Sequence, residues 1–258
     1  MVKLAANLSM MFTEMPFLDR FAAAARAGFK AVEFMFPYEE DAGTVAGALR
    51  DNSLELALFN MPAGDWAAGE RGLGALPGRE AEFREGVRKA RDYALALRCT
   101  RLHLMAGKTG GMEPSACNAA LVANVQFAAD LLLPNGIEVL LEPINTRVDI
   151  PGYHYDTSGA AMDVIARSGR PNVRLQYDIY HMQIMEGNLA RTIERLLPSI
   201  GHIQLADNPG RGEPGTGEIN FPWLFERIDA LGYNGFIGCE YKPVTETSSG
   251  LSWATPYL

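Results

Sequence analysis

The sequence predicts an α/β protein that folds as a single (β/α)8 barrel over residues 1–258. Short apolar runs recur along the whole chain, and each is followed by a stretch with the period of an amphipathic helix. Eight such pairs share 258 residues, or about 32 residues each, which is the usual share in a barrel of about 250 residues. Because strand and helix alternate strictly, the sheet is expected to be parallel.

The predicted strands are short, apolar and evenly spread. They cover residues 4–9, 31–36, 54–59, 101–106, 137–142, 173–178, 202–206 and 236–240. The segments between them carry apolar side chains at helical spacing, as in Phe17, Phe21 and Ala24, or Leu121, Val125 and Ala128. Pro16 and Gly28 are typical of the start and the end of the first helix.

A doubly wound sheet is the alternative architecture. It normally has fewer strands or a second domain, and the turn after the first predicted strand lacks the glycine pattern GxGxxG. The chain contains no linker or low-complexity tract that would divide it. Two long loops, residues 60–77 and 207–220, follow the third and seventh strands, at the end of a barrel where enzymes place their sites.

Composition excludes several classes of protein. The net charge of −8 disfavours a nucleic-acid partner, which needs clustered Lys and Arg. Three widely spaced cysteines and no CxxC motif disfavour a disulfide framework or a zinc finger. We find neither an unbroken apolar run of about 18 residues nor a signal-peptide pattern, and therefore expect a cytoplasmic protein with no membrane partner.

Polar side chains lie at or near the ends of four successive predicted strands. Glu142 ends the fifth strand, Asp178 the sixth and Glu240 the eighth, and Gln204 lies within the seventh. In a closed barrel these strand ends converge on one mouth, where three carboxylates would repel one another without a cation. Oxygen ligands favour a hard divalent ion, so we predict that these four residues bind Mg²⁺ or Mn²⁺.

Long motifs that contain these residues resemble a known family. The segments LLEPINTRVDIPGY, QYDIYHMQIMEGNL, GHIQLADNPGRGEPGTGEINF and IGCEYKP resemble the hydroxypyruvate isomerase family, within the xylose isomerase-like barrel superfamily, which also includes 2-oxo-tetronate isomerases. The N-terminal AANLSMMFTEMPFLDRFAAAARAGF, VEFMFPY and GLGALPGRE match as well, so the resemblance covers nearly the whole chain.

The resemblance implies Glu142 and Glu240 as an acid/base pair. Hydroxypyruvate and tartronate semialdehyde differ in the position of a carbonyl group, and an aldose–ketose type shift needs a base, an acid and a means of stabilising the enediolate between them. Related ketose epimerases imply metal ligands at positions 142, 178, 204 and 240. They usually have a histidine where this chain has Gln204, which removes a strong nitrogen ligand.

Three further residues are candidates for substrate binding. His181 follows Asp178 by three residues and is expected to hydrogen-bond a substrate oxygen. Arg211, on the glycine-rich loop, can hold a carboxylate with two parallel bonds, and Lys242 can neutralise the site or bind the substrate acid. We expect residues 209–217 to act as a mobile lid, and His103 and His202 to be structural.

Four other functions are weighed against hydroxypyruvate isomerisation. A 2-oxo-tetronate isomerase shares the chemistry and differs in pocket size, whereas a ketose 3-epimerase needs room for five or six carbons. A nuclease of the endonuclease IV type needs a histidine-rich zinc cluster, and this chain has four scattered histidines. A barrel that only binds a sugar acid would not need both glutamates. Related barrels often pair, so a homo-oligomer is compatible with the sequence.

Overall fold

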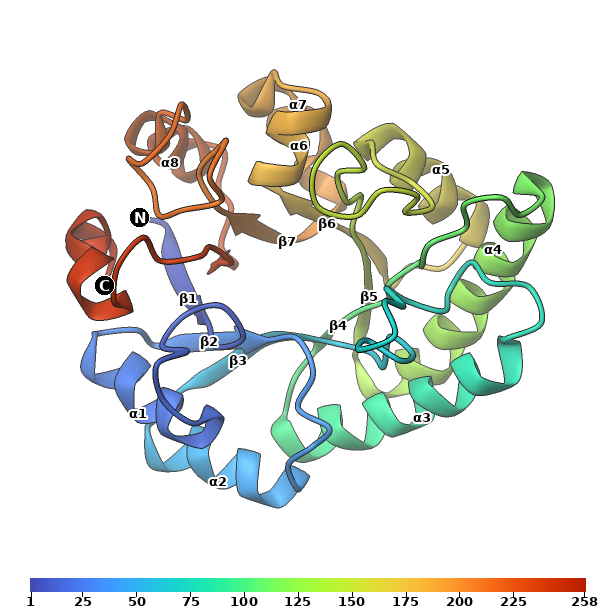
Figure 1. Ribbon diagram of the computed structural model, residues 1–258, viewed down its shortest axis with the longest axis horizontal. Helices are drawn as coiled ribbons and strands as arrows, with labels where there is room; N and C mark the ends of the chain where they lie inside the picture. The colour runs from blue at the N-terminus through green and yellow to red at the C-terminus, as the bar shows by residue number, and fades with distance from the viewer.

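The protein is a closed eight-stranded parallel barrel surrounded by helices. The computed structural model describes residues 1–258, and its strands follow one another around the barrel in chain order, with the eighth paired to the first (Figure 1). The predicted (β/α)8 architecture is therefore confirmed. All eight predicted strands are present, with ends that differ from the prediction by at most three residues.

The strands are three to six residues long. They are β1 (Lys3–Asn7), β2 (Ala31–Phe34), β3 (Glu55–Asn60), β4 (Arg101–His103), β5 (Glu138–Leu141), β6 (Val173–Asp178), β7 (Ile200–Leu205) and β8 (Phe236–Cys239). Their central residues are almost all buried, because one face of each strand lines the barrel and the other is covered by helices.

The helices form the outer ring in Figure 1. They are α1 (Phe17–Arg26), α2 (Ala42–Asp51), α3 (Glu80–Leu97), α4 (Pro114–Leu132), α5 (Ser158–Ser168), α6 (Ile179–Met185), α7 (Leu189–Leu196) and α8 (Phe221–Ala230), with 3-10 turns η1 (Leu133–Asn135), η2 (Leu197–Ser199) and η3 (Thr247–Tyr257). The segment Pro114–Asn135 is long and apolar enough to cross a membrane by length and composition alone. In the structure α4 packs between α3 and α5 against β5, as a core helix does.

The barrel interior is apolar at the bottom and polar at the top. Ala5, Ala31 and Ala57 form a small buried cluster beside Phe236. Two residues further along β1 and β2, side chains on the same face of each strand are Asn7 and Glu33, both buried. The floor of small side chains leaves room above it for a polar layer near the carboxyl ends of the strands.

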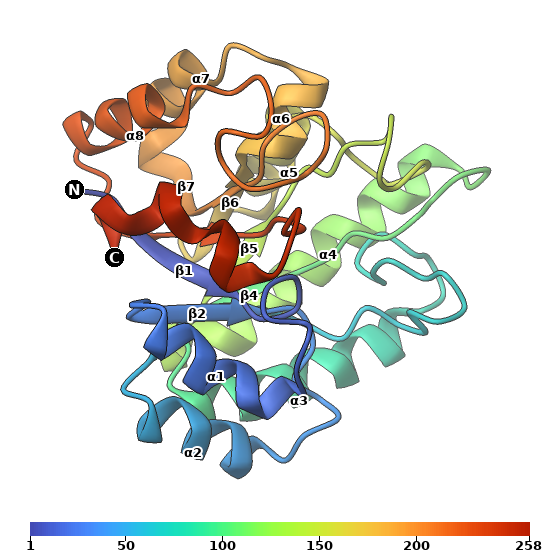
Figure 2. The same ribbon diagram turned by 60° about the vertical axis from the view of Figure 1, so that its left-hand side comes forward.

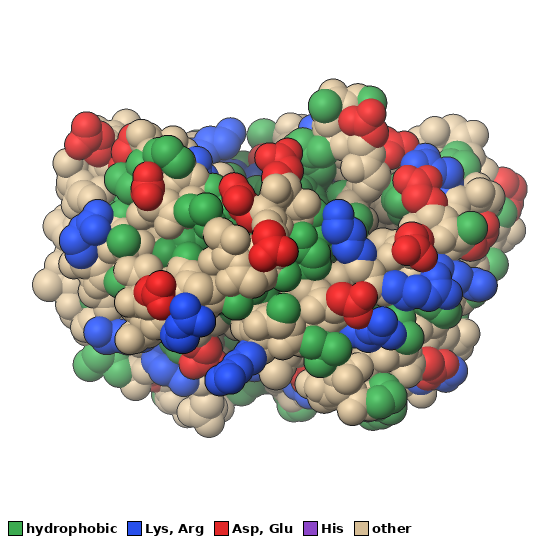
Figure 3. All heavy atoms as spheres, turned by 90° about the horizontal axis from the view of Figure 1, so that it is seen from below, with side chains coloured by type: hydrophobic (Ala, Val, Ile, Leu, Met, Phe, Trp, Pro, Cys, Tyr) green, Lys and Arg blue, Asp and Glu red, His purple; other side chains and the backbone are tan.

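The C-terminal segment closes the side of the barrel near its start. Figure 2 shows η3 crossing in front of β1, close to both termini. The Thr247 hydroxyl accepts a hydrogen bond of 2.6 Å from the backbone N–H of Phe12, which ties this segment to the loop after β1. On the face shown in Figure 3, acidic and basic side chains are interspersed rather than gathered by sign.

Candidate active site

Glu142, Asp178, Gln204 and Glu240 lie at the carboxyl ends of β5 to β8. Asp178 and Gln204 are partners in the β6–β7 register, and Glu142 and Glu240 directly follow the last residues of β5 and β8. Glu142, Asp178 and Gln204 are buried, and the Glu240 side chain is 12% exposed. The strand ends therefore bring the predicted group to one end of the barrel.

Glu142 is a buried carboxylate with few donors. The Nδ1 atom of His103 is 3.4 Å from its Oε2, and its Oε1 has no hydrogen-bond partner. Burial raises the pKa of Glu142 well above its usual value, and the negative charges of Glu240 and Asp178 raise it further. Burial also lowers the pKa of His103 to about 3, so this histidine is neutral and gives Glu142 little compensation.

Glu240 is held by donors on several sides. Its Oε2 accepts hydrogen bonds from the side-chain amides of Gln204 at 2.6 Å and Asn7 at 3.2 Å, and its Oε1 pairs with Arg211 at 2.7 Å. Burial raises the pKa of Glu240, while the positive charge of Arg211 lowers it. The two glutamates thus have different surroundings, because only Glu240 has strong donors.

Another buried carboxylate, Glu33, supports those donors from below. Glu33 Oε1 accepts from Asn7 at 2.9 Å and from Gln204 at 2.8 Å, and its Oε2 lies 2.7 Å from the His202 Nε2. Gly238 on β8 makes room for this carboxylate, since a Cβ there would lie 2.1 Å from Glu33 Oε2. Glu33 and His202 therefore fix the orientation of both amides that hold Glu240.

The same contacts define how Gln204 faces the site. Its Nε2 donates to the carboxylates of Glu33 and Glu240, and its Oε1 accepts from Gln176 at 2.6 Å. The opposite amide orientation would set an oxygen against two carboxylates. In this arrangement Gln204 presents its nitrogen, and not the oxygen that we predicted as a metal ligand, to the acidic group.

Asp178 and His181 are joined by the start of α6. Asp178 Oδ1 accepts from the backbone N–H groups of Tyr180 and His181 at the helix N-terminus, which leaves its buried Oδ2 without a partner. The His181 Nε2 lies 3.8 Å from Asp178 Oδ2 and 3.8 Å from Glu142 Oε1. Two bare carboxylate oxygens therefore flank one imidazole nitrogen.

Arg211 reaches the site from the loop after β7. Besides Glu240, its guanidinium pairs with Asp149 at 2.9 Å, and it lies 5.1 Å from the centroid of the Tyr180 ring. Arg211 has a left-handed backbone with φ of 55°, an uncommon conformation for a non-glycine residue and one often found at functional sites. Its Nε is buried and has no partner, so one donor stays available.

The Lys242 side chain is exposed, unlike the residues of this buried group. Its backbone N–H donates to the Arg211 carbonyl at 2.8 Å, which supports the conformation of the loop. A role for its ammonium group in substrate binding stays a prediction.

The loop that carries Arg211 is organised around Asp207. This buried carboxylate accepts backbone hydrogen bonds from Asn208, Gly215, Gly217 and Ile219, at 2.9 to 3.1 Å. Glu213, also buried, accepts from the backbone N–H of Val244 at 3.0 Å. These bonds hold much of the segment predicted as a lid against the barrel in the structure described here.

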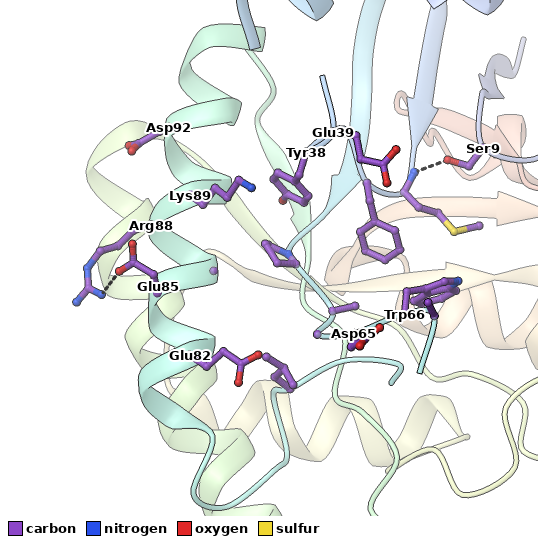
Figure 4. Close-up of a pocket in the computed structure, with 18 residues that line it drawn as sticks. Ser9, Tyr38, Glu39, Asp65, Trp66, Glu82, Glu85, Arg88, Lys89 and Asp92 are labelled. Atoms are coloured by element: carbon purple, nitrogen blue, oxygen red, sulfur yellow. Dashed lines mark hydrogen bonds and ion pairs between the residues drawn. The ribbon is translucent and has the colours of Figure 1, made fainter. Parts of the chain in front are cut away.

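A large open cleft of about 1210 Å³ lies on the other side of the same rim (Figure 4). It is lined by residues that follow β1, β2 and β3 and by α3, among them Ser9, Tyr38 and Trp66, and by none of the four strand-end residues. It borders the site through Ser9, whose backbone N–H donates to the Asn7 side-chain oxygen at 3.0 Å. Phe36 and Trp66 pack together in its wall, with ring centroids 5.0 Å apart.

The acidic group fits a divalent metal. Glu142, Asp178 and His181 each offer an atom within 4.8 Å of the others, and Glu142 Oε1 and Asp178 Oδ2 are buried oxygens with no partner. Bare carboxylate oxygens are the ligands that hard cations prefer. This buried Glu/Asp/His group could therefore bind a metal.

Several residues around the site were not in the predicted set. Glu33, Asn7 and Asn145 were not identified, and His103 and His202 were predicted to be structural. Glu33 carried a usable signal, because it is a charged residue inside the apolar run AVEFMF, just as Glu240 is inside FIGCE. Asn145 and Asp149 lie on a loop, and the sequence gives no sign of what they contact.

Comparison with known proteins identifies the family of this barrel. A model of the family described as xylose isomerase-like TIM barrel matches residues 21–257. The chain is 51% identical to hydroxypyruvate isomerase of Escherichia coli over 258 residues, with all of both chains covered, and 50% identical to 2-oxo-tetronate isomerase of Cupriavidus necator, with 100% of this chain and 99% of the relative covered. A crystal structure described as AP endonuclease, family 2, from Brucella melitensis is 51% identical, with a TM-score of 0.98 over 100% of this chain and 99% of that one.

Proposed function

The chain belongs to the xylose isomerase-like TIM barrel family, and on this premise we propose that it interconverts hydroxypyruvate and tartronate semialdehyde. The observation that carries the proposal is the pair of carboxylates Glu142 and Glu240 at one end of the barrel, where the charge of Glu240 raises the pKa of Glu142. A barrel that only bound a small acid would have no need of two buried glutamates at a cost in stability.

Two glutamates supply both proton steps of this isomerisation. One removes a proton from C3 of hydroxypyruvate, and the electron pair of that C–H bond forms the enediolate double bond between C3 and C2. The other returns a proton to C2, while the hydroxyl proton moves from the C3 oxygen to the C2 oxygen. In the reverse direction the two side chains exchange roles, so the assignment of base and acid depends on the direction of the reaction.

The neighbouring residues would bind and orient the substrate. We assign the free Nε of Arg211 to the substrate carboxylate and the Nε2 of His181 to a substrate oxygen that lies between Glu142 and Asp178. Glu142, Asp178 and Glu240 would hold Mg²⁺ or Mn²⁺, which when bound supplies polarisation of the carbonyl group and charge stabilisation of the enediolate.

A 2-oxo-tetronate is the second candidate substrate. The cleft of about 1210 Å³ beside the acidic group is larger than a three-carbon acid requires, and the relative from Cupriavidus necator carries that name at 50% identity. A ketose 3-epimerase fits less well, because Gln204 stands where those enzymes usually have a histidine. A nuclease needs a histidine-rich metal cluster, and the cluster here offers one histidine.

A substrate panel tests the proposal. Purified protein is incubated in D₂O with three- and four-carbon oxo-acids and with ketoses, with and without Mg²⁺ or Mn²⁺, and each reaction is followed by proton NMR. We expect deuterium incorporation and product formation with hydroxypyruvate. If no oxo-acid exchanges its protons and a ketose does, the chain is an epimerase, and the proposal fails.

A further inference from the structure

Asn145 lies behind His181, on the loop that follows β5, and both side chains are fully or almost fully buried. The Asn145 side-chain oxygen accepts from the backbone N–H groups of Val148 and Asp149, each at 3.0 Å. Its Nδ2 donates to Asp149 Oδ2 at 2.6 Å and lies 2.7 Å from His181 Nδ1.

These four contacts permit only one orientation of the amide. If the Asn145 oxygen and nitrogen were exchanged, an oxygen would face the Asp149 carboxylate, and an NH₂ group would face two backbone N–H groups. The amide nitrogen therefore faces His181, and it has only hydrogens to offer. It follows that His181 Nδ1 accepts a hydrogen bond and carries no proton.

A neutral imidazole with a bare Nδ1 carries its proton on Nε2. The Nε2 atom is the one that lies 3.8 Å from both Glu142 Oε1 and Asp178 Oδ2. A metal-binding histidine normally shows the opposite pattern, because its second ring nitrogen donates to a carboxylate or a carbonyl.

We propose that Asn145 is a positioning residue that fixes His181 as an Nε2–H donor toward a substrate oxygen, so that His181 takes no part in binding the metal. The ligands are then carboxylates alone, and the histidine supplies a hydrogen bond to the oxygen on which charge develops. The catalytic part of this inference rests on the proposed isomerase function. The part that concerns the position of the proton stands on the hydrogen bonds alone.

The test exchanges the donor and the acceptor. In the double variant Asn145→Asp/Asp149→Asn, the 145 side chain keeps an oxygen for the two backbone N–H groups. Its second oxygen accepts from the new amide at 149 and turns an acceptor toward His181 Nδ1. The single variant Asp149→Asn is the matched control, because it leaves the Asn145 amide in place.

The first readout is NMR of protein with ¹⁵N-labelled histidine, with the His181 signals assigned by their loss in His181→Gln. We expect the Nε2–H tautomer in the wild type and in Asp149→Asn, and the Nδ1–H tautomer in the double variant. An Nδ1–H or doubly protonated His181 in the wild type would overturn the inference, whether or not the protein turns over any oxo-acid.

The second readout is calorimetric titration with Mn²⁺ alone. His181→Gln should leave the Kd for Mn²⁺ within about threefold of the wild type, since even the loss of a residue that only orients a ligand typically costs about 10- to 100-fold. A weakening of tenfold or more would make His181 a ligand and refute the proposal.

The third readout is kinetic. Loss of one donor to a developing oxyanion costs about 10²–10³ in kcat, so the double variant should lose that much kcat relative to Asp149→Asn with little change in KM. An equal kcat in the two variants would refute the role of the Nε2–H group. If the wild type itself turns over none of the substrates, the proposed function fails, and the NMR result still decides the tautomer.

Discussion

Replacing Glu142 or Glu240, the proposed acid/base pair, with glutamine should lower kcat sharply in both cases and should stabilise the folded protein more at 142 than at 240. Glu142 is 4% exposed, and its Oε1 has no partner, so the folded protein carries a carboxylate with almost no compensation. Glu240 accepts from Arg211, Gln204 and Asn7. Glutamine has the same shape as glutamate and no charge, so the substitution removes a cost at 142 and removes favourable bonds at 240.

The magnitudes follow from these contacts. An unsatisfied buried polar group costs about 1–3 kcal/mol, and more if it is charged. Glu142→Gln should therefore raise the free energy of unfolding by about 2 kcal/mol, or raise Tm by about 4–8 °C in a protein of this size. Glu240→Gln loses charge-assisted bonds but also removes a buried charge, since burial raises the pKa of Glu240 to about 8, so the free energy of unfolding should rise less than in Glu142→Gln. Each substitution should lower kcat by about 10²–10⁴ or more.

The pH dependence of this stability difference checks independently that the Glu142 carboxylate destabilises the folded protein. Because the pKa of Glu142 is raised on folding, the carboxyl group favours the folded state least at high pH, where it must ionise in the interior. The advantage of Glu142→Gln should then be small at pH 4, near the unfolded pKa of about 4.3, and should grow as the pH rises toward 8.

Thermal and urea unfolding in a chelating buffer at pH 4, 6 and 8 measure these differences. Glu138→Gln, at the opposite end of β5, is the control. The Glu138 carboxylate lies 3.5 Å from Arg101, and its side chain is 30% exposed. Activity should therefore be unchanged, and the free energy of unfolding should change by less than about 1 kcal/mol. A Glu142→Gln protein that is less stable than the wild type at pH 8, or that keeps its turnover, would refute the reasoning.

Three further outcomes are expected. Exhaustive chelation should lower turnover and added Mg²⁺ or Mn²⁺ should restore it; full activity after stripping would reject a metal role. Arg211→Ala should raise KM at least about tenfold, because it removes the proposed partner of the substrate carboxylate. It should also lower kcat, because Glu240 loses its ion pair. An unchanged KM in steady-state kinetics would mean that the substrate carboxylate binds elsewhere. Glu33→Gln should lower kcat by about 10- to 100-fold, since small displacements of a catalytic group are costly, with KM within about twofold; a normal kcat would show that Glu240 holds its position without Glu33.

The fold was predictable from the sequence because its determinants are local. Eight apolar runs separated by amphipathic helices allow few arrangements other than a closed parallel barrel, and the helix boundaries at Pro16 and Gly28 agree with the observed α1. The strand-end carboxylates were predictable for a related reason. A parallel barrel brings the same end of every strand together, so position along each strand determines position in space.

The rest of the site depends on contacts between segments far apart in the chain. The Asn145–His181 contact joins the loop after β5 to the start of α6, and the Arg211–Asp149 pair joins residues 62 positions apart. The direction in which the Gln204 amide faces is decided by Glu33, a residue 171 positions away. Residue type alone suggested an oxygen ligand at Gln204, and the structure shows its nitrogen facing the carboxylates.

The groups proposed for proton transfer and the cleft proposed to select substrate length lie on different halves of the barrel mouth. The bare oxygens of Glu142 and Asp178 and the Nε2 of His181 all belong to β5, β6 and the segments that directly follow them. The cleft belongs to the loops after β1 to β3, and Asn7 and Ser9 connect it to Glu240. We propose that a three-carbon acid occupies only the first half and that a longer acid extends past Glu240 into the cleft lined by Phe36 and Trp66. The proton-transfer groups would meet either substrate in the same way, so we expect selectivity between three and four carbons to arise in the cleft. Substitutions at Phe36 or Trp66 should therefore alter KM for the longer acid. They should leave kcat for the shorter acid unchanged.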